Sequence, residues 1–195
     1  METTMPKTLL IPGLDGSPAA HWQQWWALRD PDALLLDLSD VSRPVPAVWE
    51  IEVAGAILQH PGAILVGHSL GAILIARLLA KWPHLKVGGA ILVAPAEPRH
   101  SERTESFGPI FEESLGVPAY VVSSRNDPWM SFTQAERLAR AWRADVVDLG
   151  FAGHINVDSG FGPWPGGVVL RDELARRPVP VMPPEQALER AFYRA

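Results

Sequence analysis

A serine flanked by two glycines, in Gly67-His-Ser-Leu-Gly71, constrains the fold more than any other feature of the sequence. The segment follows the apolar run 62–66, typical of a buried strand, and opens into the apolar stretch 72–80, typical of a helix. A strand that passes directly into a helix needs a sharp turn, and side chains at its flanks would collide with neighbouring backbone. The strained turn holds the hydroxyl of Ser69 out at the carboxyl end of the strand, where another side chain can take its proton.

The rest of the chain alternates short apolar runs with segments of helical pattern. Strands are predicted at residues 7–11, 33–37, 63–66, 90–93, 119–123 and 146–149, and helices near 18–28, 46–60, 69–81 and 131–142. Most of the runs are continuously apolar, which is typical of parallel strands covered on both faces. We therefore expect an α/β fold with a doubly wound, six-stranded, mainly parallel sheet and helices on both faces.

The length of the chain, 195 residues, suits one such domain with a substantial core. No linker or repeat divides it, so residues 1–195 are expected to form a single domain. Residues 95–117 form the longest connection without an assigned element. The tail 178–195 is a proline-rich extension that is expected to end in a short helix, and the charges at 171–177 are interpreted as a solvated helix face.

Composition excludes several classes of function. The net charge of −5 and the lack of a basic run argue against binding to nucleic acid or to an anionic membrane. The sequence has no cysteine, which excludes disulfides, thiolate metal sites and a cysteine nucleophile. No histidine and carboxylate group has the spacing of metal ligands, so neither a metal nor another cofactor is expected. The N-terminus lacks a signal pattern and no apolar stretch is long enough to span a bilayer, so we expect a cytoplasmic protein.

Three loops at the carboxyl ends of predicted strands carry the side chains of a catalytic triad. Ser69 follows the third strand, Asp127 follows the fifth, and His154 follows the sixth. The carboxyl ends of parallel strands share one edge of the sheet, where the chemistry of open α/β folds gathers. A serine hydroxyl needs a base to take its proton, and an imidazole with a pKa of about 6.5 can do so. We therefore predict that Ser69 is the nucleophile, His154 the base, and Asp127 the group that orients the imidazole.

The oxyanion formed during attack needs hydrogen-bond donors. The backbone N–H of Leu70, at the start of the helix after the nucleophile, is predicted to be one. The second is expected from the loop after the first strand, with Leu14 preferred and Gly13 or Asp15 as alternatives.

The role of several aromatic side chains near these loops can be interpreted in two ways. Trp22, Trp129 and Trp164 are candidate substrate-binding residues, although core packing fits them as well. His21 is interpreted first as a packing residue and second as a pocket residue. His68 either fills the variable position of the turn or contacts the site.

Five separated motifs occur in the order found in a known group of enzymes. They lie at residues 12–22, 67–71, 124–128, 153–156 and 160–165. Together they resemble the small serine hydrolases grouped with retinoblastoma-binding protein nine and bacterial YdeN, over about residues 7–177. The resemblance implies a minimal α/β-hydrolase fold without a cap, and it places the triad of that family on Ser69, Asp127 and His154.

The same resemblance leaves the substrate open. Binding to retinoblastoma protein is not expected, because it depends on a cysteine-containing motif that this chain lacks. The predicted function is hydrolysis of small carboxylic esters through an acyl-enzyme, in a shallow site. Two alternatives stay open: an aminopeptidase or amidase with Asp15 or Glu97 binding a substrate amine, and a non-catalytic binding protein that kept the fold. A homo-oligomer is also possible, through the C-terminal helix.

Overall fold

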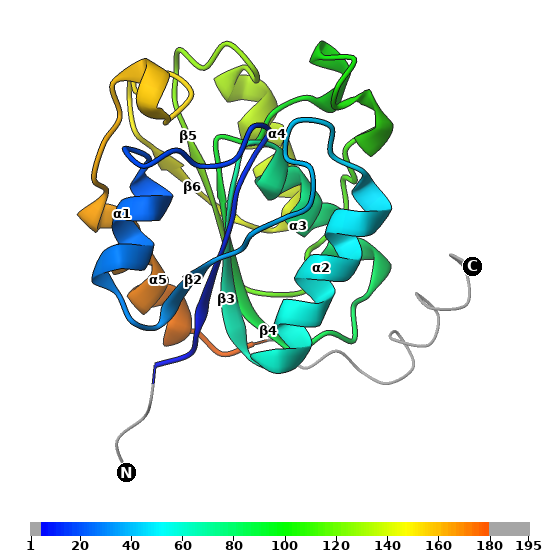
Figure 1. Cartoon of the computed structure of the whole chain (residues 1–195), viewed down its shortest axis with the longest axis vertical. Helices are drawn as coiled ribbons and strands as arrows, with labels where there is room; N and C mark the ends of the chain where they lie inside the picture. The colour runs from blue at the N-terminus through cyan, green and yellow to red at the C-terminus, as the bar shows by residue number, and fades with distance from the viewer. Residues whose placement is uncertain (1–4, 180–195) are drawn as a thin grey trace.

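Six parallel strands form the centre of the protein in the computed structural model, which describes residues 5–179 (Figure 1). The strands are β1 (Thr8–Ile11), β2 (Ala33–Leu35), β3 (Ala63–His68), β4 (Val87–Val93), β5 (Ala119–Ser123) and β6 (Asp145–Asp148). Their order in the sheet is β2-β1-β3-β4-β5-β6, and every neighbouring pair is parallel. The chain runs outward from β1 to β2 and returns to β3 on the other side of β1. The loops after β1 and β3 therefore diverge, which creates the crevice in which open α/β sheets bind ligands.

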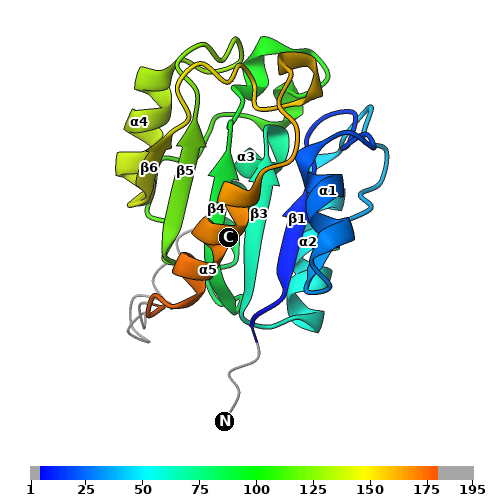
Figure 2. The ribbon, with the colours of Figure 1, turned by 90° about the vertical axis from the view of Figure 1, so that its left-hand side faces the viewer.

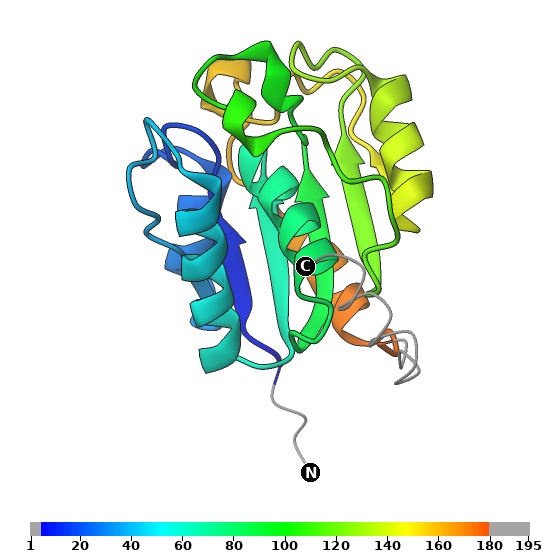
Figure 3. The ribbon, with the colours of Figure 1, turned by 90° about the vertical axis from the view of Figure 1, so that its right-hand side faces the viewer.

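Helices cover both faces of the sheet. The helices α1 (Trp22–Arg29) and α5 (Pro165–Ala175) lie on one face (Figure 2). The other face is covered by α2 (Pro46–Gln59), α3 (Leu70–Lys81) and α4 (Phe132–Trp142) (Figure 3). In β3, Ile64 and Val66 pack toward α1 while Leu65 packs toward α3, and all three are buried. Both faces of the strand are thus apolar, which is why the sequence shows continuous rather than alternating runs. The predicted α/β fold is confirmed.

Two helices begin where a side chain caps them. Ser131 accepts a hydrogen bond from the N–H of Gln134 at 3.2 Å, as expected for an N-cap. The first helix begins at Trp22 rather than near residue 18, because His21 is its N-cap. The Nδ1 atom of His21 accepts a hydrogen bond from the N–H of Gln23 at 3.2 Å.

Two glycines lie inside β4, which begins three residues earlier than predicted. A Cβ atom on Gly88 would lie 2.5 Å from the carbonyl oxygen of Gly62, and one on Gly89 would lie 2.7 Å from the side chain of Leu174. Glycine is therefore required at both positions because neighbouring atoms lie too close for a side chain. The sequence pattern instead predicts that the strand begins after these glycines, because glycine is uncommon inside strands.

Arg171 corrects the interpretation of residues 171–177 as a solvated helix face. Its side chain is buried and donates to the hydroxyl of Thr8 at 2.6 Å and to the carboxylate of Asp30 at 2.9 Å. The guanidinium also lies over the ring of Trp26. A buried charge needs such partners, so Arg171 ties α5 to the start of β1 and the end of α1.

The connection between β4 and β5 holds two short 3-10 turns, at Pro98–His100 and Glu105–Phe107, and no cap domain is inserted within this described segment. Phe107 is fully buried and its ring contacts that of Trp49, with centroids 5.8 Å apart. The connection is therefore anchored on the core and forms one wall above the sheet. Within residues 5–179, no helix is long and apolar enough to cross a membrane. Most of the extension 178–195, including its expected helix, lies outside the described residues.

Candidate active site

Ser69 occupies the sharp turn between β3 and α3, with φ +56° and ψ −118°. This backbone conformation is strained for a residue with a side chain. A Cβ atom on Gly67 would lie 2.6 Å from the backbone of Gly71, and one on Gly71 would lie 2.5 Å from the carbonyl oxygens of Ile11 and Pro12. Both glycines are therefore required by close backbone approach, and the second brings the loop after β1 against the start of α3.

The structure brings the three predicted triad residues together. The Ser69 hydroxyl lies 2.8 Å from Nε2 of His154, and Nδ1 of His154 lies 2.9 Å from the nearer carboxylate oxygen of Asp127. The side chains of His154 and Asp127 are only 8% and 3% exposed, so little water competes for these contacts. A carboxylate on Nδ1 stabilises the tautomer in which Nε2 is free to accept the serine proton.

Hydrogen bonds between two loops hold His154 in place. The Asn126 side-chain oxygen accepts from the N–H of Gly153 at 2.8 Å and from the hydroxyl of Ser124 at 2.7 Å. The N–H of His154 donates to the hydroxyl of Ser159 at 2.9 Å. These supports were missed in the sequence, where polar residues after a strand are indistinguishable from ordinary loop residues.

His68, whose role the sequence left open, does contact the site. Its Nε2–H donates to the backbone carbonyl of His154 at 2.9 Å, and its ring lies 5.0 Å from the ring of His154. Burial, with the nearby imidazoles, holds the pKa of His68 well below its usual value. The ring therefore stays neutral and braces the histidine loop without adding charge.

The N–H groups of Leu70 and Leu14 are available as oxyanion donors. Neither group donates to another described residue, and both residues line the pocket at Ser69. The N–H of Asp15 instead donates to the carbonyl of Val41 at 2.8 Å, which removes that alternative. Gly13 does not line the pocket, so Leu14 remains the best match to the prediction.

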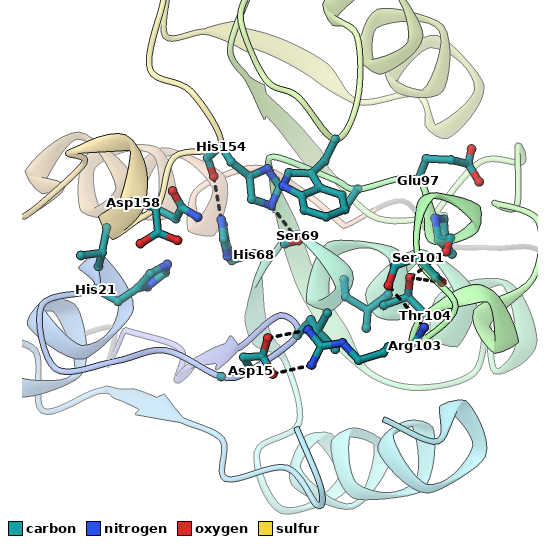
Figure 4. A pocket seen from close by; sticks show the side chains of 18 of the residues that line it. Asp15, His21, His68, Ser69, Glu97, Ser101, Arg103, Thr104, His154 and Asp158 are labelled. Carbon is teal, nitrogen blue, oxygen red and sulfur yellow. Dashed lines mark hydrogen bonds and ion pairs between the residues drawn. The ribbon is translucent and has the colours of Figure 1, made fainter. Parts of the chain in front are cut away.

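A pocket of about 360 Å³ opens in front of Ser69 (Figure 4). One wall comes from the loop after β1 and the histidine loop, and the other from the connection after β4. Trp129 lines the pocket, whereas Trp22 and Trp164 do not. Those two side chains are buried with Trp26 on the α1 face of the sheet. The expectation that Trp22 and Trp164 bind substrate is therefore wrong, because both side chains pack inside the hydrophobic core and bury their apolar surface there.

Charged residues at the pocket are mostly paired. Asp15 forms a two-pronged ion pair with Arg103, with distances of 2.9 and 2.7 Å, and this pair links the two walls (Figure 4). Glu97 is paired with Arg99 at 3.1 Å. Asp158 also lines the pocket and makes no ion pair or hydrogen bond with another described residue. Within residues 5–179, no group of three or more histidine and carboxylate side chains could hold a metal ion.

The sequence from 8 to 173 matches the model of a family described as serine hydrolase. The chain belongs to this serine hydrolase family. It is 34% identical to a YdeN-like hydrolase from Pectobacterium atrosepticum, with 89% of this chain and 92% of that chain covered and a TM-score of 0.80. The YdeN protein of Bacillus subtilis is 23% identical, with 88% and 100% covered and a TM-score of 0.77.

The fold of this serine hydrolase is also that of more distant enzymes. A carboxylesterase from Bacillus cereus is 18% identical, with 89% and 90% of the two chains covered and a TM-score of 0.55. No curated protein matches the chain. The resemblance to the YdeN group is confirmed, as is the minimal α/β-hydrolase fold.

The buried histidines make the stability of this serine hydrolase sensitive to acid. Burial, with the nearby His154, lowers the pKa of His21 from 6.5 to about 4. Between these values the unfolded chain binds more protons than the folded one, so the free energy of unfolding falls as pH is lowered through this window. At about 1.4 kcal/mol per pH unit, His21 alone is expected to remove about 2 kcal/mol between pH 7 and pH 4.5.

Urea unfolding at the two pH values checks this expectation, with His21→Asn as the control. Asparagine is a strong N-cap that does not titrate. The variant is therefore expected to lose about 2 kcal/mol less than the native protein on acidification. Equal losses would show that His21 is not held neutral by the fold.

Proposed function

We propose that this protein hydrolyses small carboxylic esters through an acyl-enzyme intermediate. The observation that carries the proposal is the contact of 2.8 Å between the Ser69 hydroxyl and Nε2 of His154, whose Nδ1 lies 2.9 Å from the carboxylate of Asp127. Ser69 Oγ attacks the ester carbonyl carbon while its proton passes to His154. The N–H groups of Leu70 and Leu14 stabilise the negative oxygen, and His154 then gives the proton to the leaving alcohol.

Deacylation reuses the same groups. A water molecule loses a proton to His154 and attacks the acyl carbon, and Ser69 leaves with the proton that His154 returns. Asp127 remains ionised throughout and stabilises the imidazolium that forms in both halves of the reaction. Each proton taken up by His154 is therefore released again, and no other acid or base is needed. The predictions of a cytoplasmic location and of a small-molecule partner accompany this proposal.

An uncapped pocket of about 360 Å³ favours short acyl groups. We expect kcat/KM on 4-nitrophenyl esters to be highest for acetate to hexanoate and at least about tenfold lower for dodecanoate. The reason is that a long acyl chain extends beyond the uncapped pocket and finds no apolar surface to cover it. Steady-state rates across the series, below the micelle concentration of each ester, measure this. A preference for the long chain would contradict the proposal for small esters.

A second candidate, hydrolysis of aminoacyl substrates, is favoured by one residue. Asp15 and Glu97, the carboxylates that the sequence suggested for binding an amine, are each paired with an arginine. Asp158 is the unpaired carboxylate at the pocket among the described residues, and it could accept a substrate ammonium. To separate the two candidates, kcat/KM on the 4-nitrophenyl ester and the 4-nitroanilide of alanine is compared with kcat/KM on 4-nitrophenyl butyrate.

A further inference from the structure

His21 presents a buried hydrogen-bond donor with no partner at the edge of the catalytic pocket. The side chain lines the pocket and the residue is only 2% exposed. It reaches from the start of α1 toward His68 and Asp158, on the side of the site opposite Glu97 (Figure 4). No described residue makes a hydrogen bond with its Nε2 atom. A buried polar atom without a partner is costly and uncommon, so a group outside the described protein is expected to fill this place.

The capping contact of His21 fixes which nitrogen carries the proton. Because Nδ1 accepts the hydrogen bond of the Gln23 N–H at 3.2 Å, that nitrogen is unprotonated and the neutral ring carries its proton on Nε2. The lowered pKa, about 4, keeps the ring neutral at pH 7. His21 therefore carries one uncharged N–H donor in the wall of the pocket, where the atom is buried and has no partner among the described residues.

His68 offers the complementary group. Its Nε2–H donates to the backbone of His154, so Nδ1 of the neutral ring is an acceptor. No described residue makes a hydrogen bond with that Nδ1 atom. The two rings lie with their centroids 4.8 Å apart, and both line the pocket. A donor on one ring and an acceptor on its neighbour match a hydroxyl group, which accepts and donates through a single oxygen.

The charges around the pair disfavour an anionic ligand, and an ammonium group has no lone pair to accept the N–H of His21. Neither imidazole is charged at pH 7, so neither attracts an anion. Asp158, which has no ion-pair partner among the described residues, lies on the same side of the pocket and repels a carboxylate or phosphate. An apolar group would leave the donor of His21 unsatisfied.

We propose that His21 and His68 form a hydroxyl-binding subsite, so that the preferred substrates of the enzyme carry a neutral hydroxyl group beside the ester. The inference rests on the proposed esterase function and specifies its substrate class. His21 is then a substrate-binding residue that donates to the hydroxyl oxygen, while His68 Nδ1 accepts the hydroxyl proton. No bond is broken at this subsite.

Matched esters test the proposal on the native enzyme. One pair differs in the acyl part, 4-nitrophenyl butyrate and 4-nitrophenyl 3-hydroxybutyrate, and the other in the alcohol, propyl butyrate and 2-hydroxyethyl butyrate. For at least one pair, kcat/KM is expected to be about tenfold higher for the hydroxyl form, mainly through KM. Comparison of each ratio with that of His21→Asn cancels the intrinsic reactivity of the esters.

The two variants of His21 separate binding from folding. His21→Asn keeps a strong N-cap but lacks an N–H at the position of Nε2. For the pair that shows the preference, the ratio of kcat/KM between the hydroxyl ester and its matched ester is therefore expected to fall about tenfold. His21→Gln weakens the cap but places an amide N–H farther out, so part of the preference is expected to return. Thermal melts of both variants report the capping effect independently.

A binding measurement keeps the test independent of turnover. In Ser69→Ala labelled with ¹⁵N-histidine, 2-hydroxyethyl butyrate is expected to shift the Nε2 resonance of His21, and propyl butyrate is not. Equal ratios in the native enzyme and His21→Asn, or a His21 resonance unmoved by both esters, would overturn the subsite and assign Nε2 to a bound water. Lack of hydrolysis of every ester by the native enzyme would instead count against the proposed function.

Discussion

Ser69→Ala is expected to lower kcat/KM on 4-nitrophenyl butyrate by about ten-thousandfold or more while the protein stays folded. The variant removes the attacking oxygen but keeps the Cβ atom, so the turn between β3 and α3 retains its packing. Residual turnover would come from the Leu70 and Leu14 N–H groups and from binding, which catalyse weakly without a nucleophile. Progress curves at high enzyme concentration, corrected for spontaneous hydrolysis, measure the loss.

Labelling with a fluorescent fluorophosphonate identifies the serine directly. The native protein is expected to be labelled and Ser69→Ala is not, because the reagent reacts with a serine activated by a neighbouring base. Ser131→Ala is the matched control, since the hydroxyl of Ser131 caps α4. That variant is expected to lose about 1 kcal/mol of stability and to keep its labelling. Label that persists in Ser69→Ala would place the nucleophile elsewhere, and a folded native protein without label would favour the non-catalytic alternative.

Gly71→Ala is expected to destabilise the protein by about 3 kcal/mol. The added Cβ atom would lie 2.5 Å from the carbonyl oxygens of both Ile11 and Pro12. These are backbone atoms at the end of β1, which cannot move away without disturbing the pairing of β1 with β3. The same shift would displace Leu14 from Ser69, so the folded fraction is also expected to lose activity.

Gly55→Ala supplies the control for a glycine in a helix. Gly55 lies inside α2, and a Cβ atom there would meet nothing within 4 Å. Alanine is the better helix former, so this variant is expected to gain about 0.5 to 1 kcal/mol and to keep full activity. Urea unfolding of both variants measures the contrast. A loss below about 1 kcal/mol in Gly71→Ala would show that the turn is looser than its contacts indicate.

The part of this site that can be predicted depends on local sequence and on the common direction of the strands. The turn at Ser69 can be read because strand, glycines and helix are contiguous in the sequence. Asp127 and His154 can be placed because parallel strands end at one edge of the sheet, so the loops after β5 and β6 must meet the loop after β3. Neither inference needs knowledge of how side chains pack.

The parts that the sequence did not reveal depend on contacts between distant segments. Trp164 looks like a pocket residue because it follows His154 closely, yet it packs on Trp22 from the other end of the chain, with ring centroids 5.2 Å apart. Arg171 is buried because Thr8 and Asp30 satisfy it. His21 caps α1 through Nδ1, which leaves its Nε2–H without a partner among the described residues. That this residue also lines the catalytic pocket can be seen only in the folded structure.

Parallel strands also separate the chemistry of this protein from the rest of its surface. Every residue assigned to the reaction lies at the carboxyl edge of the sheet, whereas the turns at residues 60–62 and 82–86, which precede β3 and β4, lie at the amino edge. Attachment to a solid support through a cysteine introduced at either turn would leave the mouth of the pocket facing the solution. Because the sequence of 195 residues has no cysteine, a single introduced thiol would give one defined orientation on such a support.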